Sequence, residues 1–307
     1  MYDFDILIDT TADLDEAFQA KYDIKVLPAH LVIDGKDTLS FLKWERMSRE
    51  DFYTQLKADP TRFSTAPPSV GEMAAAIEEI VAQGRGVLYP TISSGISGTY
   101  NFAVQAKAAV LEKHPDARVE IVDTLRFGPA IGLIAVNAAI MRADGKGIGE
   151  VAENIESTKN RYHQAGWLDD LSFVAKQGRL THSKAFFGKL VGIKPIGEFD
   201  YNGLTTVIGK IKGEKAAFDA LMNYIEKTIE DPQNQIVFIA QSNRLKQAEK
   251  YKAMIEERFH PKEVCIKDVF PSCGTNVGPG LMAAYYIGAP ISRDLSFERG
   301  ILEAFNG

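Results

Sequence analysis

Val87-Leu88-Tyr89 opens the segment that decides the fold, because this short apolar run leads through a loop of small residues into a helical pattern. The loop is Ser93-Ser94-Gly95-Ile96-Ser97-Gly98-Thr99, whose glycines and hydroxyl residues are typical of turns. The apolar residues that follow recur at helical spacing, at Tyr100, Ala103, Val104, Ala108 and Leu111. A buried strand, a small-residue loop and an amphipathic helix form one unit of an α/β fold.

The same order of strand, loop and helix occurs on either side of this segment. Ile6-Leu7-Ile8 leads through Asp9-Thr10-Thr11 into a helical stretch at 12–20, and a strand at 119–123 leads into an apolar helix at 129–141. Such alternation predicts a mostly parallel sheet covered by helices, with ligands in the loops at the carboxyl ends of the strands.

Local signals mark turns and helix starts in this first half. Asp34-Gly35 follows the extended stretch 24–33 and indicates a hairpin. Ser69 lies three residues before Glu72, so a capping box is expected to open a helix, which Gly84 ends. A surface helix is expected within 42–60.

The second half has a different pattern and is predicted to be an α+β domain with antiparallel pairing. The boundary lies near 163, which gives domains at 1–163 and 164–307, with a C-terminal extension from about 290. Asn202-Gly203 indicates a second hairpin. The expected strands are 194–200, 204–212, 235–240 and 263–270, and the expected helices are 148–162, 214–230 and 245–258. In the extension, Ile301, Leu302 and Phe305 are candidates to pack on the body or on a partner.

Composition excludes several classes of protein. The 307 residues include 41 acidic and 35 basic side chains, so nothing overall draws the chain to nucleic acid. The two cysteines, Cys265 and Cys273, indicate neither a disulfide framework nor a zinc site. The N-terminus has no pattern of a signal peptide, and no apolar run approaches the length of a membrane span. A cytoplasmic protein without spanning membrane contact is expected.

Three loops rich in Gly, Ser and Thr are candidate anion sites, because hydroxyls and free backbone N–H groups favour negative charge. They are 64–69, 93–99 and 274–280. Each is also typical of an ordinary cap or turn. Lys176-Gln177-Gly178-Arg179 is a candidate basic clamp or a solvated turn.

Catalytic and cofactor motifs are missing from the sequence. There is no phosphate loop, and Ser97 is one glycine short of a nucleophile elbow. The histidines are scattered, so neither a metal nor another cofactor is expected. Asp9, Asp13 and Asp123 are candidate acid or base groups at strand ends, although Asp13 also fits a first helical turn.

Read together, these segments resemble the DegV family, whose members include the fatty-acid-binding subunits of bacterial fatty acid kinase. The resemblance covers about 1–288 in the order that the family shows. Its motifs are Ile8-Asp9-Thr10-Thr11-Ala12-Asp13-Leu14, Ser93-Ser94-Gly95-Ile96-Ser97-Gly98-Thr99-Tyr100, Gly178-Arg179-Leu180, Gly192-Ile193-Lys194-Pro195-Ile196 and Gly274-Thr275-Asn276-Val277-Gly278-Pro279-Gly280.

The resemblance implies a two-domain fold with a fatty acid in a tunnel between or beside the domains. It implies that Thr65, Ser94 and Asn276 bind the carboxylate, and that Arg179 lies near the ligand entrance or contacts a partner. It further implies a separate kinase catalytic subunit that phosphorylates the bound acid for phospholipid synthesis, so this chain itself has no catalytic residues. The remaining ligand-adjacent or partner-contact positions are Thr10, Ser93, Gly95 and Thr275.

The sequence departs from the family pattern at positions that matter for the ligand, including 65–69, where a hydroxyl and an amide are lost and Thr65 is retained. Asn276 stands where the family usually has histidine, which keeps a donor and loses any positive charge. Leu125-Arg126-Phe127 replaces smaller residues, which is expected to shorten or reshape the pocket.

Two other functions stay open at this point. A hydrolase or transferase would use the Ser93-Ser94 loop, and a burst with acyl esters would identify it. A binder of another small anionic or apolar ligand would be identified by its bound ligand.

Overall fold

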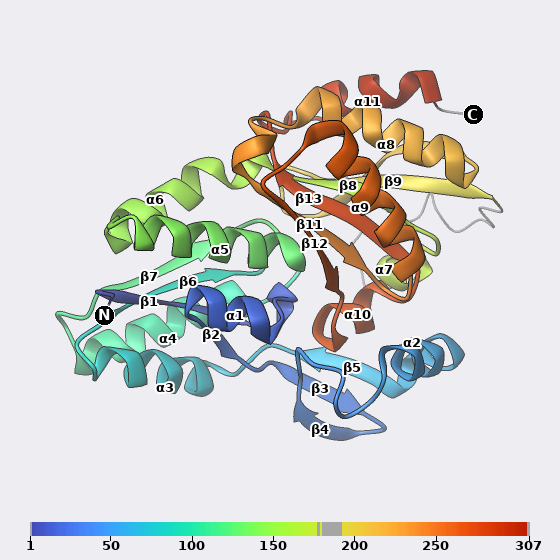
Figure 1. The fold of residues 1–307 in the computed structure, drawn as a ribbon. Helices are drawn as coiled ribbons and strands as arrows, with labels where there is room; N and C mark the ends of the chain where they lie inside the picture. The colour runs from blue at the N-terminus through green and yellow to red at the C-terminus, as the bar shows by residue number, and fades with distance from the viewer. Residues whose placement is uncertain (1, 177–178, 180–191, 306–307) are drawn as a thin grey trace. The chain divides into compact units, whose positions relative to one another are not determined.

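The computed structural model describes residues 2–176, 179 and 192–305 (Figure 1). The chain divides into two compact units. The first comprises Met1–Arg46, Thr61–Lys159 and Phe270–Cys273, and the second comprises Met47–Pro60, Asn160–Val269 and Gly274–Gly307. Within the described residues, no helix combines the length and apolar character needed to cross a bilayer.

A four-stranded parallel sheet forms the centre of the first unit. Its order is β2-β1-β6-β7, with β1 at Phe4–Asp9, β2 at Ile24–Leu27, β6 at Gly86–Thr91 and β7 at Val119–Asp123. Helices cover both faces (Figure 1). They are α1 (Glu16–Tyr22), α3 (Val70–Val81), α4 (Thr99–Lys113), α5 (Pro129–Ala143) and α6 (Ile148–Thr158).

Side-chain alternation explains why this sheet is buried on both sides. Leu7, Val87 and Tyr89 pack into one cluster with residues of α3 and α4. The residues between them, such as Ile6 and Leu88, point to the opposite face, against which α5 packs, and are fully buried. Strands buried on both faces read as continuous apolar runs, which is what the sequence shows.

A small antiparallel sheet also belongs to the first unit. It has the order β4-β3-β5, with β3 at His30–Ile33, β4 at Lys36–Leu39 and β5 at Phe63–Ala66. Asp34 and Gly35 have φ angles of 52° and 77°, so the expected hairpin is confirmed. The extended stretch 24–33 is divided between two sheets, and Pro28, which has no N–H to donate, stands at the break.

The second unit contains a six-stranded sheet in the order β10-β9-β8-β13-β11-β12, antiparallel except between β11 and β12. The α/β class, with a parallel N-terminal sheet and a mostly antiparallel C-terminal sheet, is thereby confirmed. The strands are β8 (Tyr162–Leu168), β9 (Ile193–Phe199), β10 (Thr205–Lys212), β11 (Ile236–Gln241), β12 (Glu263–Asp268) and β13 (Leu281–Ile287). The helices are α2 (Arg49–Ala58), α7 (Ser172–Lys176), α8 (Glu214–Thr228), α9 (Leu245–Phe259), α10 (Pro271–Val277, whose first residues fall in the first unit) and α11 (Ser296–Leu302).

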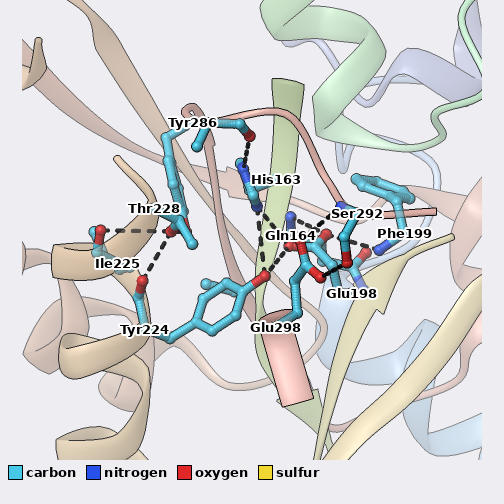
Figure 2. A network of polar contacts seen from close by, with 12 residues as sticks. His163, Gln164, Glu198, Phe199, Tyr224, Ile225, Thr228, Tyr286, Ser292 and Glu298 are labelled. Atoms are coloured by element: carbon cyan, nitrogen blue, oxygen red, sulfur yellow. Dashed lines mark hydrogen bonds and ion pairs between the residues drawn. The ribbon is translucent and has the colours of Figure 1, made fainter. Parts of the chain in front are cut away.

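A network of buried polar side chains lies inside the second unit (Figure 2). The ring of His163 contacts the Glu198 carboxylate through Nδ1 at 2.8 Å and the Ala289 carbonyl through Nε2 at 2.7 Å. Glu198 also accepts from the Tyr224 hydroxyl at 2.8 Å and from the N–H groups of Gln164 and Phe199. Because each of these groups has a partner, the network is a satisfied structural element that joins β8, β9 and α8.

The C-terminal extension packs on the second unit. Leu302 of α11 is fully buried, and α11 lies against α8 and β10. Glu298 is also fully buried, and its carboxylate accepts from the backbone N–H of Ser292 at 2.9 Å and from the Ser292 hydroxyl (Figure 2).

Gly166 allows the two central strands of the second unit to approach closely. A Cβ atom there would lie 2.2 Å from the Met282 carbonyl oxygen and 2.3 Å from Ala283 Cα. We expect Gly166→Ala to lower the free energy of unfolding by about 3 kcal/mol or more, since two backbones would have to separate. Urea unfolding measures this loss.

Gly300→Ala is the matched control within the same unit. Its Cβ would meet nothing within 4 Å inside α11, so it should stabilise the protein by about 0.5–1 kcal/mol. Equal stabilities for the two variants would contradict the close approach of β8 and β13.

Candidate functional site

Polar residues gather where the strands of the parallel sheet end. Ile6 pairs with Leu88 and Thr91 pairs with Asp123, so the carboxyl ends of β1, β6 and β7 lie at one edge (Figure 1). The loops that leave this edge carry the residues singled out in the sequence: Asp9, Thr10, Ser93, Ser94, Gly95 and Asp123.

Asp9 holds the loop after β1. One carboxylate oxygen accepts from the Thr11 backbone N–H at 2.7 Å and from the Thr11 hydroxyl, and the other accepts from the Tyr89 hydroxyl at 2.9 Å. Burial raises the pKa of Asp9 above its usual range. Burial and the adjacent Asp9 carboxylate raise the pKa of Tyr89 well above that of a free phenol.

The other two candidate acids are also engaged by backbone groups. Asp123 accepts from the N–H groups of Ser94 and Leu125, both at 3.1 Å. Asp13 accepts from the Phe270 N–H at 2.8 Å. The expectation that Asp13 belongs to a first helical turn is wrong, because it ends a 3-10 helix with a φ of 47°. All three carboxylates therefore shape loops.

The loop after β6 is folded around Ser93. The fully buried Ser93 accepts from Gly95 N–H through its hydroxyl at 3.1 Å, and its carbonyl accepts from the N–H groups of Ile96 and Ser97. Its own N–H donates to the Arg126 carbonyl at 2.8 Å. Ser94 donates its N–H to Asp123 and is an exposed residue.

Arg126 is a residue whose position the sequence did not reveal. It is fully buried, and its guanidinium donates to the Leu125 carbonyl at 2.8 Å. Because its backbone carbonyl accepts a hydrogen bond from the Ser93 N–H, Arg126 stabilises the serine loop. A lone arginine in an irregular segment gives no sequence signal for such a role.

A chain of hydrogen-bonded, buried hydroxyl groups begins at Thr10, in the loop after β1. Thr10 accepts from the Ala29 N–H at 3.0 Å and contacts the Ser272 hydroxyl at 2.8 Å. Ser272 in turn donates to the Ser40 hydroxyl at 2.7 Å. Sequence reasoning missed Ser40 and Ser272, since single serines in polar segments carry no pattern.

The remaining expected site residues lie on several elements. Thr65 is half-buried on β5, opposite Leu31. Thr275 and Asn276 are consecutive on α10, the first buried and the second half-buried. Arg179 is half-buried and donates its N–H to the Val174 carbonyl at 3.1 Å, while Gly178 and Leu180 beside it lie outside the described residues.

Three histidines are committed to carboxylates away from the serine loop. They are His30 with Asp37 and Glu72, His114 with Glu78, and His163 with Glu198. A serine nucleophile needs a paired base, and these three rings are engaged elsewhere. In the part of the chain that the structure describes, no group of three or more His, Cys, Asp or Glu side chains could hold a metal ion.

The capping box of α3 joins one of these histidines. Ser69 and Glu72 bond reciprocally as expected, and Glu72 also contacts His30 Nε2 at 3.1 Å. Hydrogen bonds from the Ser69 hydroxyl, the Ser69 N–H and His30 lower the pKa of Glu72 to about 2. The hydrogen bond to Glu72 raises the pKa of His30.

The lowered pKa of Glu72 and the raised pKa of His30 make stability depend on pH in opposite directions. Glu72 contributes stability that is present above its unfolded pKa and is lost as the pH falls towards about 2. His30 contributes stability that is present at acid pH and is lost as the pH rises through its raised folded pKa.

We expect Glu72→Gln to lower the pKa of His30, which an NMR titration of the imidazole would measure. An unchanged His30 titration would contradict the pairing, and Glu79→Gln, on the same helix, is the control.

The fold and these loops define a class: a two-unit α/β protein whose parallel sheet ends in hydroxyl-rich loops with engaged carboxylates. Comparison with known proteins identifies the family. A protein-family model, described as "Uncharacterised protein, DegV family", matches residues 3–289. The chain therefore belongs to the DegV family.

Relatives cover nearly the whole chain. A DegV domain-containing protein of Clostridium perfringens is 33% identical over 288 residues, which are 94% of this chain and 98% of the relative. A DegV lipid-binding protein of Thermotoga maritima superimposes with a TM-score of 0.81 at 25% identity, covering 94% of this chain and 99% of the other. A fatty-acid-binding DegV family protein of Thermus thermophilus superimposes with a TM-score of 0.83 at 20% identity, covering 94% of this chain and all of the other.

Proposed function

We propose that this protein binds a long-chain fatty acid and presents its carboxylate to a separate ATP-dependent fatty acid kinase. One observation carries the binding proposal: the chain matches, over 94% of its length, a relative described as a lipid-binding protein at 25% identity. Two further structural neighbours, from Eubacterium eligens and Ruminococcus gnavus, were solved with heptadecanoic acid and vaccenic acid.

The proposed carboxylate ligands are Thr65, Ser94 and Asn276. Neutral donors satisfy a carboxylate without neutralising it, which leaves its oxygens nucleophilic for phosphoryl transfer. The structure supports Ser94 in this role because its N–H is used by Asp123 while the residue is exposed. We assign supporting roles beside the ligand to Thr10, Ser93, Gly95 and Thr275.

The acyl chain supplies most of the affinity in this proposal. At about 0.8 kcal/mol per buried CH₂, a chain of about 16 carbons offers on the order of 10 kcal/mol before the costs of association. The contacts with the carboxylate then need to orient it more than to add binding free energy. Such a division suits a carrier whose ligand must be held with its carboxylate accessible to a partner.

The protein itself performs no chemistry in this proposal. Asp9, Asp123 and Asp13 accept hydrogen bonds from backbone N–H groups, and the rings of His30, His114 and His163 are paired with carboxylates away from the serine loop. Phosphorylation of the bound acid is therefore assigned to the kinase, and Arg179 is assigned to the surface that the kinase contacts.

Native mass spectrometry of the protein purified from bacterial cells tests the binding step. We expect a bound mass that matches a long-chain fatty acid. Removing one donor with Thr65→Ala, Ser94→Ala or Asn276→Ala should weaken oleate binding roughly 10-fold or more, as expected for a hydrogen bond to a charged group. Ser64→Ala is the matched control, since Ser64 is exposed on the opposite face of β5. A protein that is empty and also ignores added oleate and palmitate would refute the carrier function.

The partner step has its own test. Oleate-loaded protein incubated with ATP and a purified bacterial fatty acid kinase catalytic subunit should yield acyl phosphate, and either component alone should not. Arg179→Ala should retain oleate and slow this reaction, whereas Lys227→Ala, an exposed position on α8, should not. Oleate binding without any kinase-dependent product would leave a carrier and remove the kinase from the proposal.

A further inference from the structure

Asp9 is a buried carboxylate at the edge of the parallel sheet. It is 2% exposed, and among the described residues no lysine, arginine or histidine pairs with it. Its oxygens accept from the Thr11 N–H, the Thr11 hydroxyl and the Tyr89 hydroxyl. Hydrogen bonds to a carboxylate favour its charged form, whereas burial favours its protonated form. These opposing effects make the protonation of Asp9 sensitive to any further charge that is brought near.

The other titratable groups that face Asp9 come from two further elements. The Tyr89 phenol approaches from β6, and burial together with Asp9 raises its pKa well above that of a free phenol. The Cys273 thiol lies on α10, where it is hydrogen-bonded to Asp13, and burial raises its pKa as well. Phenols and thiols are neutral below their pKa, so neither group carries a charge near neutral pH. A new negative charge at this edge is therefore balanced at a carboxylate, and burial has already raised the pKa of Asp9.

Asp9 also lies on the strand next to the serine loop. Strand β1 ends at Asp9 and pairs with β6, which leads into the loop that carries Ser94. The hydrogen bond from Tyr89 to Asp9 joins the two strands near their carboxyl ends. Neighbouring strands lie about 4.8 Å apart, so a negative charge held at the serine loop is within the range over which charges interact near a buried group.

We propose that binding of the anionic head group is coupled to the uptake of a proton by Asp9. This inference rests on the proposed function, because the head group is the carboxylate assigned to Ser94. A second negative charge beside a buried carboxylate favours the protonated form of that carboxylate. The proton comes from solvent and converts Asp9 to a neutral carboxylic acid. The new O–H can donate to the Tyr89 hydroxyl, which is able to accept as well as donate, so the contact between β1 and β6 is kept.

This coupling fixes how affinity depends on pH. The complex binds the proton more tightly than the free protein does, and by linkage the protonated protein binds an anion more tightly. Affinity for an anion therefore rises as the pH falls through the pKa of Asp9 in the complex, and it levels off below the pKa of Asp9 in the free protein. An uncharged ligand with the same chain has no such dependence.

Calorimetry in two buffers of different ionisation enthalpy tests the coupling, because it counts the protons taken up with each ligand. Full-length wild type and Asp9→Asn are compared with oleate and with oleyl alcohol, from about pH 8 to about pH 5. Protonation of oleate itself is common to both proteins, so a difference between them belongs to Asp9. We expect wild type to take up more protons with oleate than Asp9→Asn does, and its affinity to rise about 10-fold more over this range. Oleyl alcohol should show neither effect.

Two further variants accompany this comparison. Asp15→Asn is the matched control, because Asp15 caps α1 by accepting from the Phe18 N–H and asparagine caps a helix equally well. It should take up as many protons as wild type. Tyr89→Phe keeps Asp9 and removes a hydrogen bond that favours its charged form, so proton uptake with oleate should move to higher pH. An unchanged pH range in Tyr89→Phe would overturn the inference even if Asp9→Asn did not fold.

The outcomes separate the inference from the proposed function. If wild type binds no oleate, the proposed function fails and the coupling with it. If wild type binds oleate while Asp9→Asn matches it in proton uptake and in pH dependence, the function stands and the coupling is refuted. If Asp9→Asn weakens oleate and oleyl alcohol equally at every pH, Asp9 has a structural role alone, which also overturns the inference.

Discussion

A single buried carboxylate organises the polar edge of the first unit. Asp9 ends β1 and takes hydrogen bonds from Thr11 and Tyr89, which ties the loop after β1 to the neighbouring strand β6. Between Asp9 and Thr11, the Thr10 hydroxyl accepts from the Ala29 N–H and contacts the Ser272 hydroxyl. The start of α10 is thereby anchored to the end of β1, although the two segments are 262 residues apart.

The polar groups of this edge are largely engaged with one another and with the backbone. Its acidic groups are occupied by backbone donors, and its hydroxyls are arranged in short chains whose members hold one another in place. Side chains that are already held in this way need little further ordering, and preorganised neutral donors suit an anionic group.

Sequence patterns predicted the elements whose local signals and tertiary environment agree. The capping box of Ser69, the Asp34-Gly35 turn and the buried parallel strands are of this kind. The two central strands of the second unit, β8 and β13, were missed because neither alternates β-branched residues: β8 contains histidine, glutamine, alanine and glycine, and β13 contains alanine and tyrosine pairs. Their pairing depends on Gly166, which only the folded structure shows to be a close approach.

Of the candidate site, the loops were predictable and the hydroxyl geometry was not. The loop at 93–99 is visible as a run of small residues after a strand. By contrast, 274–280 was expected to be a loop throughout, whereas residues up to Val277 are helical in α10. Only a helix places Ser272, Thr275 and Asn276 together, so their relation stays hidden until the backbone is known. Arg126 and Ser40 depend wholly on tertiary contacts.

The C-terminal extension carries a consequence for exchanging segments among members of this family. The family model ends at residue 289, and the extension beyond it brings a fully buried carboxylate, Glu298, into the second unit. That carboxylate is tolerable because Ser292, six residues earlier, supplies both a backbone N–H and a hydroxyl. The hydrogen bonds that compensate the burial of Glu298 therefore come from within the extension, and a graft that separated helix α11 from Ser292 would bury this carboxylate without those two donors.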